Sequence, residues 1–283
     1  MKAPRKVGES SGRGLLLALA LQVAGCGSPP PPALPPEEQR EAELRALEGE
    51  HRFRAALAKT DEWLAGAPDD AAAQAWKTRL LRQLGDERRA LEVVQARRAK
   101  APRDAALAYE EGELLAHVGL DDRALAAFDE AHALAPDDAL PAVAAAALLL
   151  SKKKPDAAGA QARLAPFQDG PHASAEARFH QGLALEAAGD PAGARAAFER
   201  TLELEPLHVP ALRDLALLVE KSGDEKAALD LWRRVKRSAS PRDEKFTQEV
   251  DAKIAALAAK VERAEKAAQA EAARKEEKPE TKQ

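Results

Sequence analysis

Residues 106–136, ALAYEEGELLAHVGLDDRALAAFDEAHALAP, decide the fold, because residues 176–206, EARFHQGLALEAAGDPAGARAAFERTLELEP, carry the same pattern. When the two stretches are aligned on their final prolines, small, aromatic and proline residues fall at the same places. The matched pairs are Gly112 and Gly182, Gly119 and Gly189, Ala124 and Ala194, Phe128 and Phe198, and Pro136 and Pro206. Self-similarity at a fixed spacing indicates a repeat architecture, in which each unit buries its apolar face against the next one.

The spacing of these residues has a physical cause in a pair of crossing helices. Gly112 and Ala124 mark positions where the two helices of one repeat cross, since larger side chains there would push the helices apart. Gly119 ends the first helix and permits the turn. Phe128 fills the space between the helices, and Pro136 ends the second helix. The pattern therefore predicts a helix-turn-helix unit.

The pattern continues in both directions along the chain. Residues 71–104 retain Gly85 and Ala90, and residues 209–242 retain Gly223 and Ala228. Two further units are degenerate: Lys153 replaces the turn glycine in the fourth, and Leu44 and His51 replace both glycines in the first. The six predicted repeats are 37–70, 71–104, 105–138, 139–174, 175–208 and 209–242. In repeat arrays the terminal units often depart from the consensus, because they cap the ends of the array.

This pattern resembles the tetratricopeptide repeat (TPR), a helix-turn-helix unit of 34 residues. The resemblance implies an all-α protein, a right-handed α-solenoid of about six repeats followed by a C-terminal capping helix. The composition agrees with a helical fold, since the chain is 45% hydrophobic, largely through alanine, and only 4% aromatic.

The resemblance also implies a concave surface, lined by the first helix of each repeat, that holds a protein partner. The positions of this sequence that match it give Tyr109, Glu113, Leu140, Val143, Leu150, Phe179, Leu183 and Leu217 as candidate groove residues, with Arg79 and Arg82 contributed by the second repeat. The alternative is that several of these side chains only pack against neighbouring helices. The chain contains no asparagine, which excludes the groove type that clamps a chaperone-tail carboxylate.

The N-terminal segment predicts export. Lys2, Arg5, Lys6 and Arg13 precede a short apolar stretch at residues 15–24, which is too short to span a bilayer. Residues 23–26, VAGC, resemble the lipobox of bacterial lipoproteins. The resemblance implies a signal peptide over residues 1–25, cleavage between Gly25 and Cys26, and lipidation of Cys26, the single cysteine. An ordinary signal peptide with an incidental cysteine is the alternative.

The residues after the cysteine predict a stalk and a location. Residues 26–36 contain the proline run of SPPPPALPP, which cannot be helical and extends as polyproline II over roughly 30 Å. Gly27 follows the cysteine, and lipoproteins without aspartate at that position usually travel to the outer membrane. The sequence therefore predicts a lipid-anchored protein of the bacterial envelope, most simply at the outer membrane facing the periplasm.

The C-terminal region departs from the repeat. An apolar stripe at helical spacing, from Phe246 through Val250 to Val261, predicts a helix over residues 243–264. This helix either caps the sixth repeat or forms a coiled-coil seam that drives homodimerisation. Residues 265–283 carry many charges and no durable stripe, and are predicted to be a disordered tail.

No motif for catalysis, for a cofactor or for a metal site is present, and the histidines lie singly. The formal charge of −4 gives no general attraction to nucleic acid. We therefore expect a non-enzymatic scaffold for protein–protein interactions in the envelope. A lipobox followed by six repeats is similar to the pilotin lipoproteins that assist type IV pilus secretins. A structural, oligomerising spacer that uses the C-terminal helix and leaves the groove empty is the alternative.

Overall fold

The structure, a computed structural model, describes residues 36–238, 240 and 243–276. The predicted signal peptide, Cys26 and nearly all of the proline-rich linker lie outside the described residues, as do residues 277–283 of the predicted tail.

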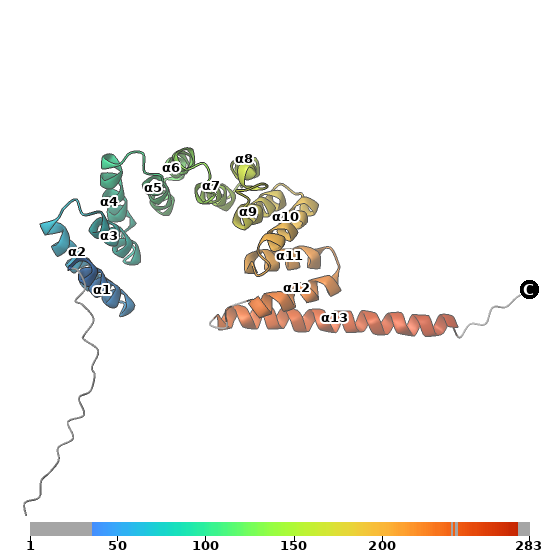
Figure 1. The fold of residues 1–283 in the computed structure, drawn as a ribbon. Coiled ribbons are helices and arrows are strands. Elements are labelled where there is room, and N and C mark those ends of the chain that lie inside the picture. The colour runs from blue at the N-terminus through green and yellow to red at the C-terminus, as the bar shows by residue number, and fades with distance from the viewer. Residues whose placement is uncertain (1–35, 239, 241–242, 277–283) are drawn as a thin grey trace, which may run out of the picture. The chain divides into compact units, whose positions relative to one another are not determined.

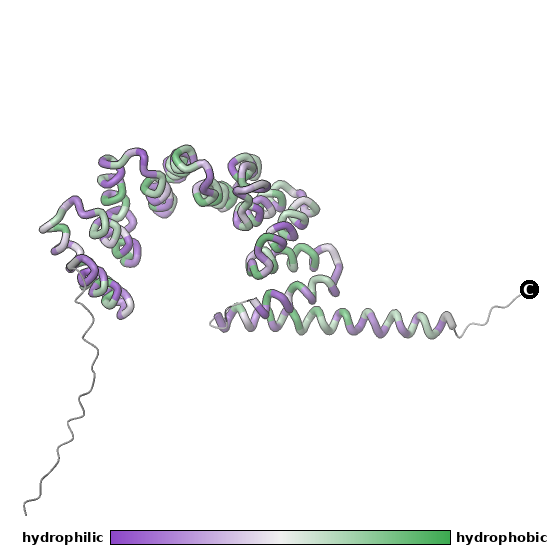
Figure 2. The backbone as a smooth tube through the Cα atoms, viewed as in Figure 1, coloured by the Kyte–Doolittle hydropathy of each residue, from purple (hydrophilic) through white to green (hydrophobic). Residues whose placement is uncertain are grey.

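Every regular element in the described part of the chain is helical. The α-helices are α1 (Pro36–Gly49), α2 (Phe53–Gly66), α3 (Ala71–Gln83), α4 (Glu87–Lys100), α5 (Ala105–His117), α6 (Asp121–Leu134), α7 (Leu140–Ser151), α8 (Ala157–Leu164), α9 (Ala175–Ala187), α10 (Pro191–Leu204), α11 (Val209–Lys221), α12 (Glu225–Ser238) and α13 (Glu244–Glu276). A short 3-10 helix, η1 (Ala165–Phe167), follows α8. Hydrophobic and hydrophilic residues alternate along these helices (Figure 2), as amphipathic helices require.

The chain divides into two compact units, Met1–Glu43 and Leu44–Gln283, and the packing that follows is that of the second. Within it, each helix packs against the next one in chain order (Figure 1), and every substantial contact joins helices of the same repeat or of adjacent repeats. Nearest-neighbour packing of helix pairs is the architecture of an α-solenoid. The predicted all-α solenoid is therefore confirmed.

The turns that follow α5 and α1 both contain a residue with positive φ, a glycine in one and a histidine in the other. Gly119 ends the first helix of its pair with φ of +79°, a conformation that glycine adopts without strain. His51 holds the corresponding position between α1 and α2 with φ of +57°, although it carries a Cβ atom. It is the only described non-glycine residue with positive φ.

Lys153 does not adopt the conformation of the glycine that it replaces. Instead, α7 ends at Ser151 and α8 begins only at Ala157, so an open loop replaces the tight turn. The backbone N–H of Asp156 donates to the carbonyl of Leu149 at 3.2 Å, which closes this loop. The side chain of Asp156 then accepts from the N–H of Gly159 and caps α8.

The two-residue insertion of the fourth repeat forms η1 and the bend after it. Phe167 at the end of η1 is buried, and its ring lies 5.5 Å from that of His132 on α6. The N–H of Ser174 donates to the carbonyl of Phe167, and the Ser174 side chain caps α9. The insertion therefore completes the core beside the short helix α8.

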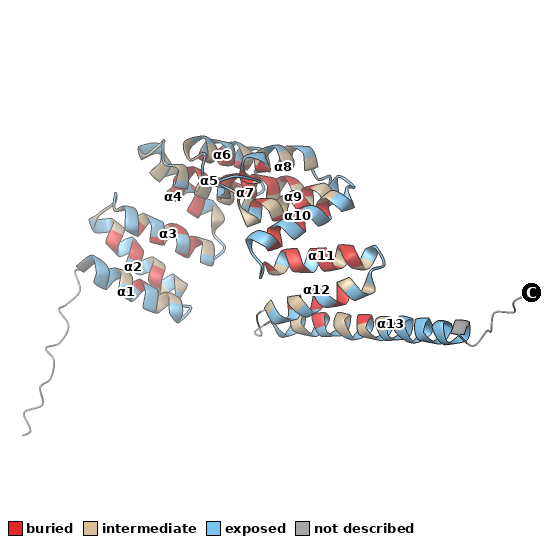
Figure 3. Cartoon of the chain, turned by 45° about the vertical axis from the view of Figure 1, so that its right-hand side comes forward, coloured by how far each residue is buried: buried red, intermediate tan, exposed pale blue. Residues whose placement is uncertain are grey.

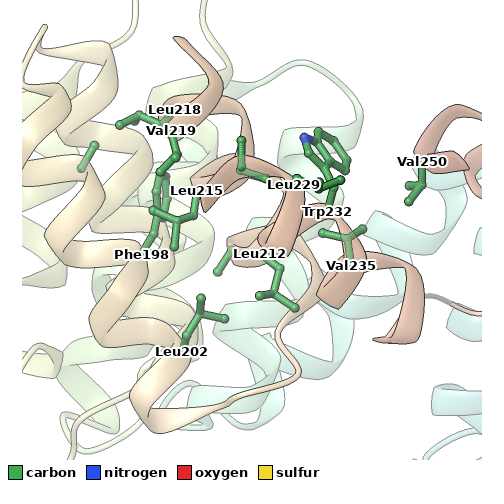
Figure 4. Packing of buried hydrophobic residues seen from close by; sticks show 14 of the residues in the cluster. Phe198, Leu202, Leu212, Leu215, Leu218, Val219, Leu229, Trp232, Val235 and Val250 are labelled. Carbon is green, nitrogen blue, oxygen red and sulfur yellow. The ribbon is translucent and has the colours of Figure 1, made fainter. Parts of the chain in front are cut away.

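The core is continuous at the C-terminal end of the array. Phe198, Leu212, Trp232 and Val250 belong to one buried cluster that draws on α9 to α13 (Figure 4). On the helices that form this cluster, buried residues lie along one face and exposed residues along the other (Figure 3).

Helix α13 is longer than the sequence predicted. Its first part packs against this cluster through Phe246, Val250, Ile254, Leu257 and Val261, as the apolar stripe predicted. It then continues through the start of the predicted tail as far as Glu276, and residues 262–274 are exposed (Figure 3). Ala, Glu, Lys and Arg favour helix without tertiary contacts, which is why the tail prediction failed there. Among the described helices, none combines the length and the apolarity needed to cross a bilayer.

Candidate interaction surface

Tyr109 and Glu113 lie one turn apart on α5 and are joined directly. The Tyr109 hydroxyl donates to Glu113 Oε1 at 3.2 Å, and the ring lies 5.8 Å from that of Phe128. Burial, followed by the charge and hydrogen bond of the Glu113 carboxylate, raises the pKa of Tyr109 to about 12, while Arg82 opposes the shift. The phenol is therefore held neutral, with one side packed on the core.

Arginines of α3 extend this surface into the preceding repeats. Arg82 Nη1 lies 3.1 Å from Glu113 Oε2, which links the second and third repeats. Arg79 Nε lies 2.7 Å from Glu48 Oε1 on α1, and its guanidinium lies 5.3 Å from the centre of the Trp76 ring. The early part of the surface is thus a row of paired charges, with the Arg79 guanidinium over the ring of Trp76.

Helix α7 presents the apolar part of the surface, since it carries no charged side chain. Leu140 at its start is 56% exposed, which is unusual for a large aliphatic residue. The N–H of Leu140 is bound by Asp138, whose charge also acts on Tyr109. Asp138 therefore both caps the start of α7 and lies within electrostatic range of Tyr109 on α5.

Two predicted groove residues belong to the core instead. Val143 is 8% exposed and packs with Ala146 and Leu164. Phe179 is 7% exposed, and its ring lies 5.0 Å from that of His208, the residue that caps the first helix of the following repeat. Val143 and Phe179, which were predicted to face a partner, are therefore nearly buried by their neighbours in the array, and little of either side chain is open to a partner.

The remaining predicted groove residues are partly buried. Leu150 packs against the core of the fourth and fifth repeats, and Leu183 and Leu217 pack against that of the fifth and sixth. Each keeps part of its side chain accessible. We name the exposed and partly exposed positions of the first helices the first-helix face: Arg79, Arg82, Tyr109, Glu113, Leu140, Leu150, Leu183 and Leu217.

His208 has a structural role that the sequence did not suggest. Its Nδ1 accepts the N–H of Ala211, so it caps α11, and its Nε2 lies 2.9 Å from Glu176 Oε2 on α9. Because Nδ1 is an acceptor, Nε2 carries the proton and donates to Glu176. No sequence motif indicates this arrangement, because histidine seldom caps a helix.

Further ion pairs join first helices across repeat boundaries. Glu186 on α9 lies 3.1 Å from Lys221 on α11, and Glu220 on α11 lies 3.0 Å from Lys253 on α13. The second contact repeats the first one repeat later. Helix α13 therefore occupies the place of the first helix of a seventh repeat.

One charged network lies partly buried beside this surface. Glu111 is 8% exposed and accepts from Gln95 and from Arg98, which also pairs with Glu130. Burial raises the pKa of the neighbouring Glu110, and Arg97 opposes that shift. These groups are tied to each other across α4, α5 and α6, which gives them a structural role. Within the described residues no cluster of His, Cys, Asp and Glu has the arrangement of a metal site.

Comparison with known proteins agrees with the fold. The chain is similar to the solved structure of a tetratricopeptide repeat protein from Parabacteroides merdae ATCC 43184, with a TM-score of 0.57 and 14% identity over 80% of this chain and 91% of that one. It is also similar to the C-terminal part of a TPR repeat-containing protein from Cytophaga hutchinsonii, with a TM-score of 0.55 and 15% identity over 76% and 94%. The solved structure of MamA (residues 41 to the end) from Desulfovibrio magneticus RS-1 is similar with a TM-score of 0.50 and 21% identity, over 59% of this chain and 94% of that one.

No protein-family model matches the chain, and no curated protein matches it. The similarity to the two repeat proteins covers most of the chain and of each of them, at low identity. The chain therefore has the tetratricopeptide-repeat fold.

Proposed function

We propose that this chain is a lipid-anchored scaffold of the bacterial envelope whose first-helix face binds a segment of a partner protein. The exposed Leu140 at the start of α7 carries the proposal, because an open aliphatic side chain and the polar Tyr109 and Glu113 pair on the preceding first helix together suit an amphipathic segment. Arg79 and Arg82 on one side supply donors that can exchange their present carboxylate partners for those of a ligand.

Residues 1–36 supply the anchor in this proposal. The lipobox resemblance at residues 23–26 places acyl chains on Cys26, and the proline run holds the array away from the membrane surface. The outer membrane facing the periplasm is the proposed location. An envelope complex such as a type IV pilus secretin is the class of partner that the similarity in architecture suggests.

Photo-crosslinking from single positions in the native host tests the partner surface. A photoreactive residue at Leu140 should give a discrete adduct with one envelope protein, and the additional substitution Tyr109→Ala should weaken that adduct. Arg123, which is exposed on the second helix α6, is the matched control position and should not give the adduct. Identical adducts from both positions would refute the proposal.

Labelling with radioactive fatty acid tests the anchor separately. The wild-type chain should incorporate the label and sediment with membranes, whereas Cys26→Ser should do neither and should keep its helical content. If the wild-type chain is not labelled, the lipoprotein assignment is wrong. The proposed partner surface is tested independently by the crosslinking experiment.

The exposed part of α13 favours a second candidate, an oligomerising spacer. Residues 262–274 extend beyond the packed part of the helix. In a spacer this segment would pair between copies. Sedimentation of chains with and without residues 262–283 distinguishes the candidates, since only a spacer loses its oligomeric state on truncation.

A further inference from the structure

Charge is divided between successive repeats in the N-terminal half of the array. The second repeat, residues 71–104, has nine basic and four acidic side chains, whereas the third, residues 105–138, has one basic and nine acidic. The first repeat has five basic and ten acidic side chains, and the fourth has four basic and two acidic. The net charge therefore changes sign at each of the three boundaries between these repeats.

The ion pairs between the first and second repeats follow this division. Lys77 Nζ on α3 lies 2.7 Å from Asp61 Oδ1 on α2, and Lys100 at the end of α4 pairs with Asp69. Arg79 adds the contact with α1 described above. Among the described residues, each ion pair across this boundary takes its cation from the second repeat and its anion from the first.

The second repeat also binds the third through its cations. Arg97 Nη1 on α4 lies 3.1 Å from Glu110 Oε2 on α5. Arg98 pairs with both Glu111 and Glu130, and the first-helix face adds a further pair between α3 and α5. The two helices of the second repeat are therefore held on both sides by carboxylates of their neighbours.

The boundary between the third and fourth repeats has the same polarity. Arg163 on α8 binds Asp129 on α6 through two hydrogen bonds of 2.8 Å each, and Lys152 lies 4.0 Å from Asp121. The cations again belong to the basic repeat and the anions to the third. The alternation ends at the next boundary, where a cation of the fifth repeat pairs with a carboxylate of the fourth.

The second repeat lacks one contact that closes the third. In the third repeat the ring of Phe128 on the second helix rests on Gly112 of the first. Thr78 and Val94 hold the corresponding positions of the second repeat. Valine is smaller than phenylalanine, so α3 and α4 bury less apolar surface against each other at this position. The second repeat thus combines ion pairs on both sides with a smaller contact between its own helices.

Dissolved salt reaches many of these charges. The side chains of Lys100 and Asp69 are 60% and 79% exposed, and that of Arg79 is 59% exposed. The screening length falls from about 10 Å at 0.1 M salt to about 3 Å at 1 M. One exposed pair contributes little to stability, but the second repeat has several pairs on each side. Its attachment to both neighbours therefore depends on ionic strength.

We propose that the second repeat is an ionic joint, a basic unit held between two acidic ones, at which the array opens locally as ionic strength rises. At low salt the attraction of α3 and α4 to the first and third repeats keeps the joint closed. At high salt the joint opens more often, while the apolar core around α11 stays closed. The joint rests on contacts within the chain and is independent of the proposed function.

Hydrogen exchange of the full chain, followed by mass spectrometry, tests the joint at about 0.1 M and 1 M NaCl. The amides of α3 and α4 should exchange about fivefold faster at the higher salt, measured relative to those of α11 in the same sample. Helix α11 is the internal reference because, among the described residues, Lys221 with Glu186 is the one lysine or arginine pair between the fifth and sixth repeats. An unchanged ratio would overturn the proposal.

Neutralising single arginines of α4 shows whether the ion pairs are responsible. Arg97→Gln removes a paired cation and should make α4 and α5 exchange several-fold faster at 0.1 M NaCl, with a smaller response to salt. Arg88→Gln is the matched control, because Arg88 is exposed on the same helix and takes part in no described ion pair. It should leave exchange unchanged, and equal acceleration in both variants would contradict the joint.

A charge swap separates charge from packing at the other boundary. Lys77→Glu and Asp61→Lys should each accelerate exchange in α3, since each places like charges together. The double variant restores an opposite pair and should return exchange to within about twofold of the wild type. If the double variant exchanged as fast as the single ones, the two side chains would act through packing and the joint would not be ionic.

Discussion

A Cβ atom on Gly182 would lie 2.3 Å from Cε1 of Phe198, so the ring of the second helix rests directly on the backbone of the first. Gly112 and Phe128 have the same relationship at 2.6 Å. In each case an aromatic ring occupies the space that any larger residue would need. This contact sets the approach of the two helices in the third and fifth repeats.

Replacing this glycine should destabilise the array. Gly182→Ala forces the Phe198 ring or the backbone to shift, at a cost of about 1–3 kcal/mol in the free energy of unfolding. Gly66→Ala is the control, since nothing lies within 4 Å of that position at the end of α2, and it should be neutral or slightly stabilising. Urea denaturation measures both variants, and equal losses would contradict the contact.

His51→Gly should stabilise the first turn. His51 adopts φ of +57°, where a side chain costs about 1 kcal/mol that glycine avoids. Gly85→Ala, at φ of +74°, should be destabilising by a similar amount. Thermal denaturation compares the two variants. A lower midpoint for His51→Gly would show that the edge contact of the imidazole with Phe53, at 5.8 Å, outweighs the strain.

Tyr109 gives a direct titration, because it is the only tyrosine of the chain. Phenolate absorbance should appear near pH 12 in the folded protein and near the ordinary value of 10 in denaturant. The folded pKa is the higher one, so the stabilisation is present below pH 10 and is lost as the pH rises to about 12.

Glu113→Gln should lower the folded pKa of Tyr109, because the carboxylate charge contributes to its rise. Glu186→Gln on α9 removes a charge from the same series of first helices and should have no such effect. If the phenolate of the native wild type appeared at pH 10, the predicted burial of the hydroxyl beside Glu113 would be incorrect.

Two truncations should separate the parts of α13. Ending the chain after Val261 removes residues 262–274, all of which are exposed, together with the residues that follow them, and should leave the unfolding free energy nearly unchanged. Ending it after residue 242 also removes Val250 and Leu257 from the core around Trp232 and should cost several kcal/mol. Denaturation with sedimentation measures both. Similar losses from the two truncations would mean that the outer part also stabilises the fold.

The repeat could be predicted because its signal is local. Gly112 and Phe128, and Gly182 and Phe198, keep one spacing, and that spacing is what a close helix crossing requires. The presence of the helices and the apolar stripe of α13 could be predicted from similar short-range patterns. The prediction of an early helix end failed, since alanine and charged residues maintain α13 beyond its last core contact.

The interaction surface was predicted less well, since it depends on distances between repeats. Position within a first helix gives the direction of the Phe179 side chain, but it does not show how close His208, at the start of α11, lies to it. The presence of Lys153 in place of glycine did not show that an open loop would replace the tight turn between α7 and α8. Pairs such as Arg98 with Glu130 depend on side-chain reach between helices, which spacing does not determine.

Nearest-neighbour packing also determines how the protein carries load. Since every substantial contact joins helices of the same or adjacent repeats, tension applied between Leu44 and the C-terminal helix passes through each interface in turn, with no bypass. Small rotations at successive interfaces add up, and one interface can open while the others hold. A chain tethered at one end to a membrane and at the other to an assembly would therefore behave as a series of springs, each as strong as its own two neighbouring surfaces.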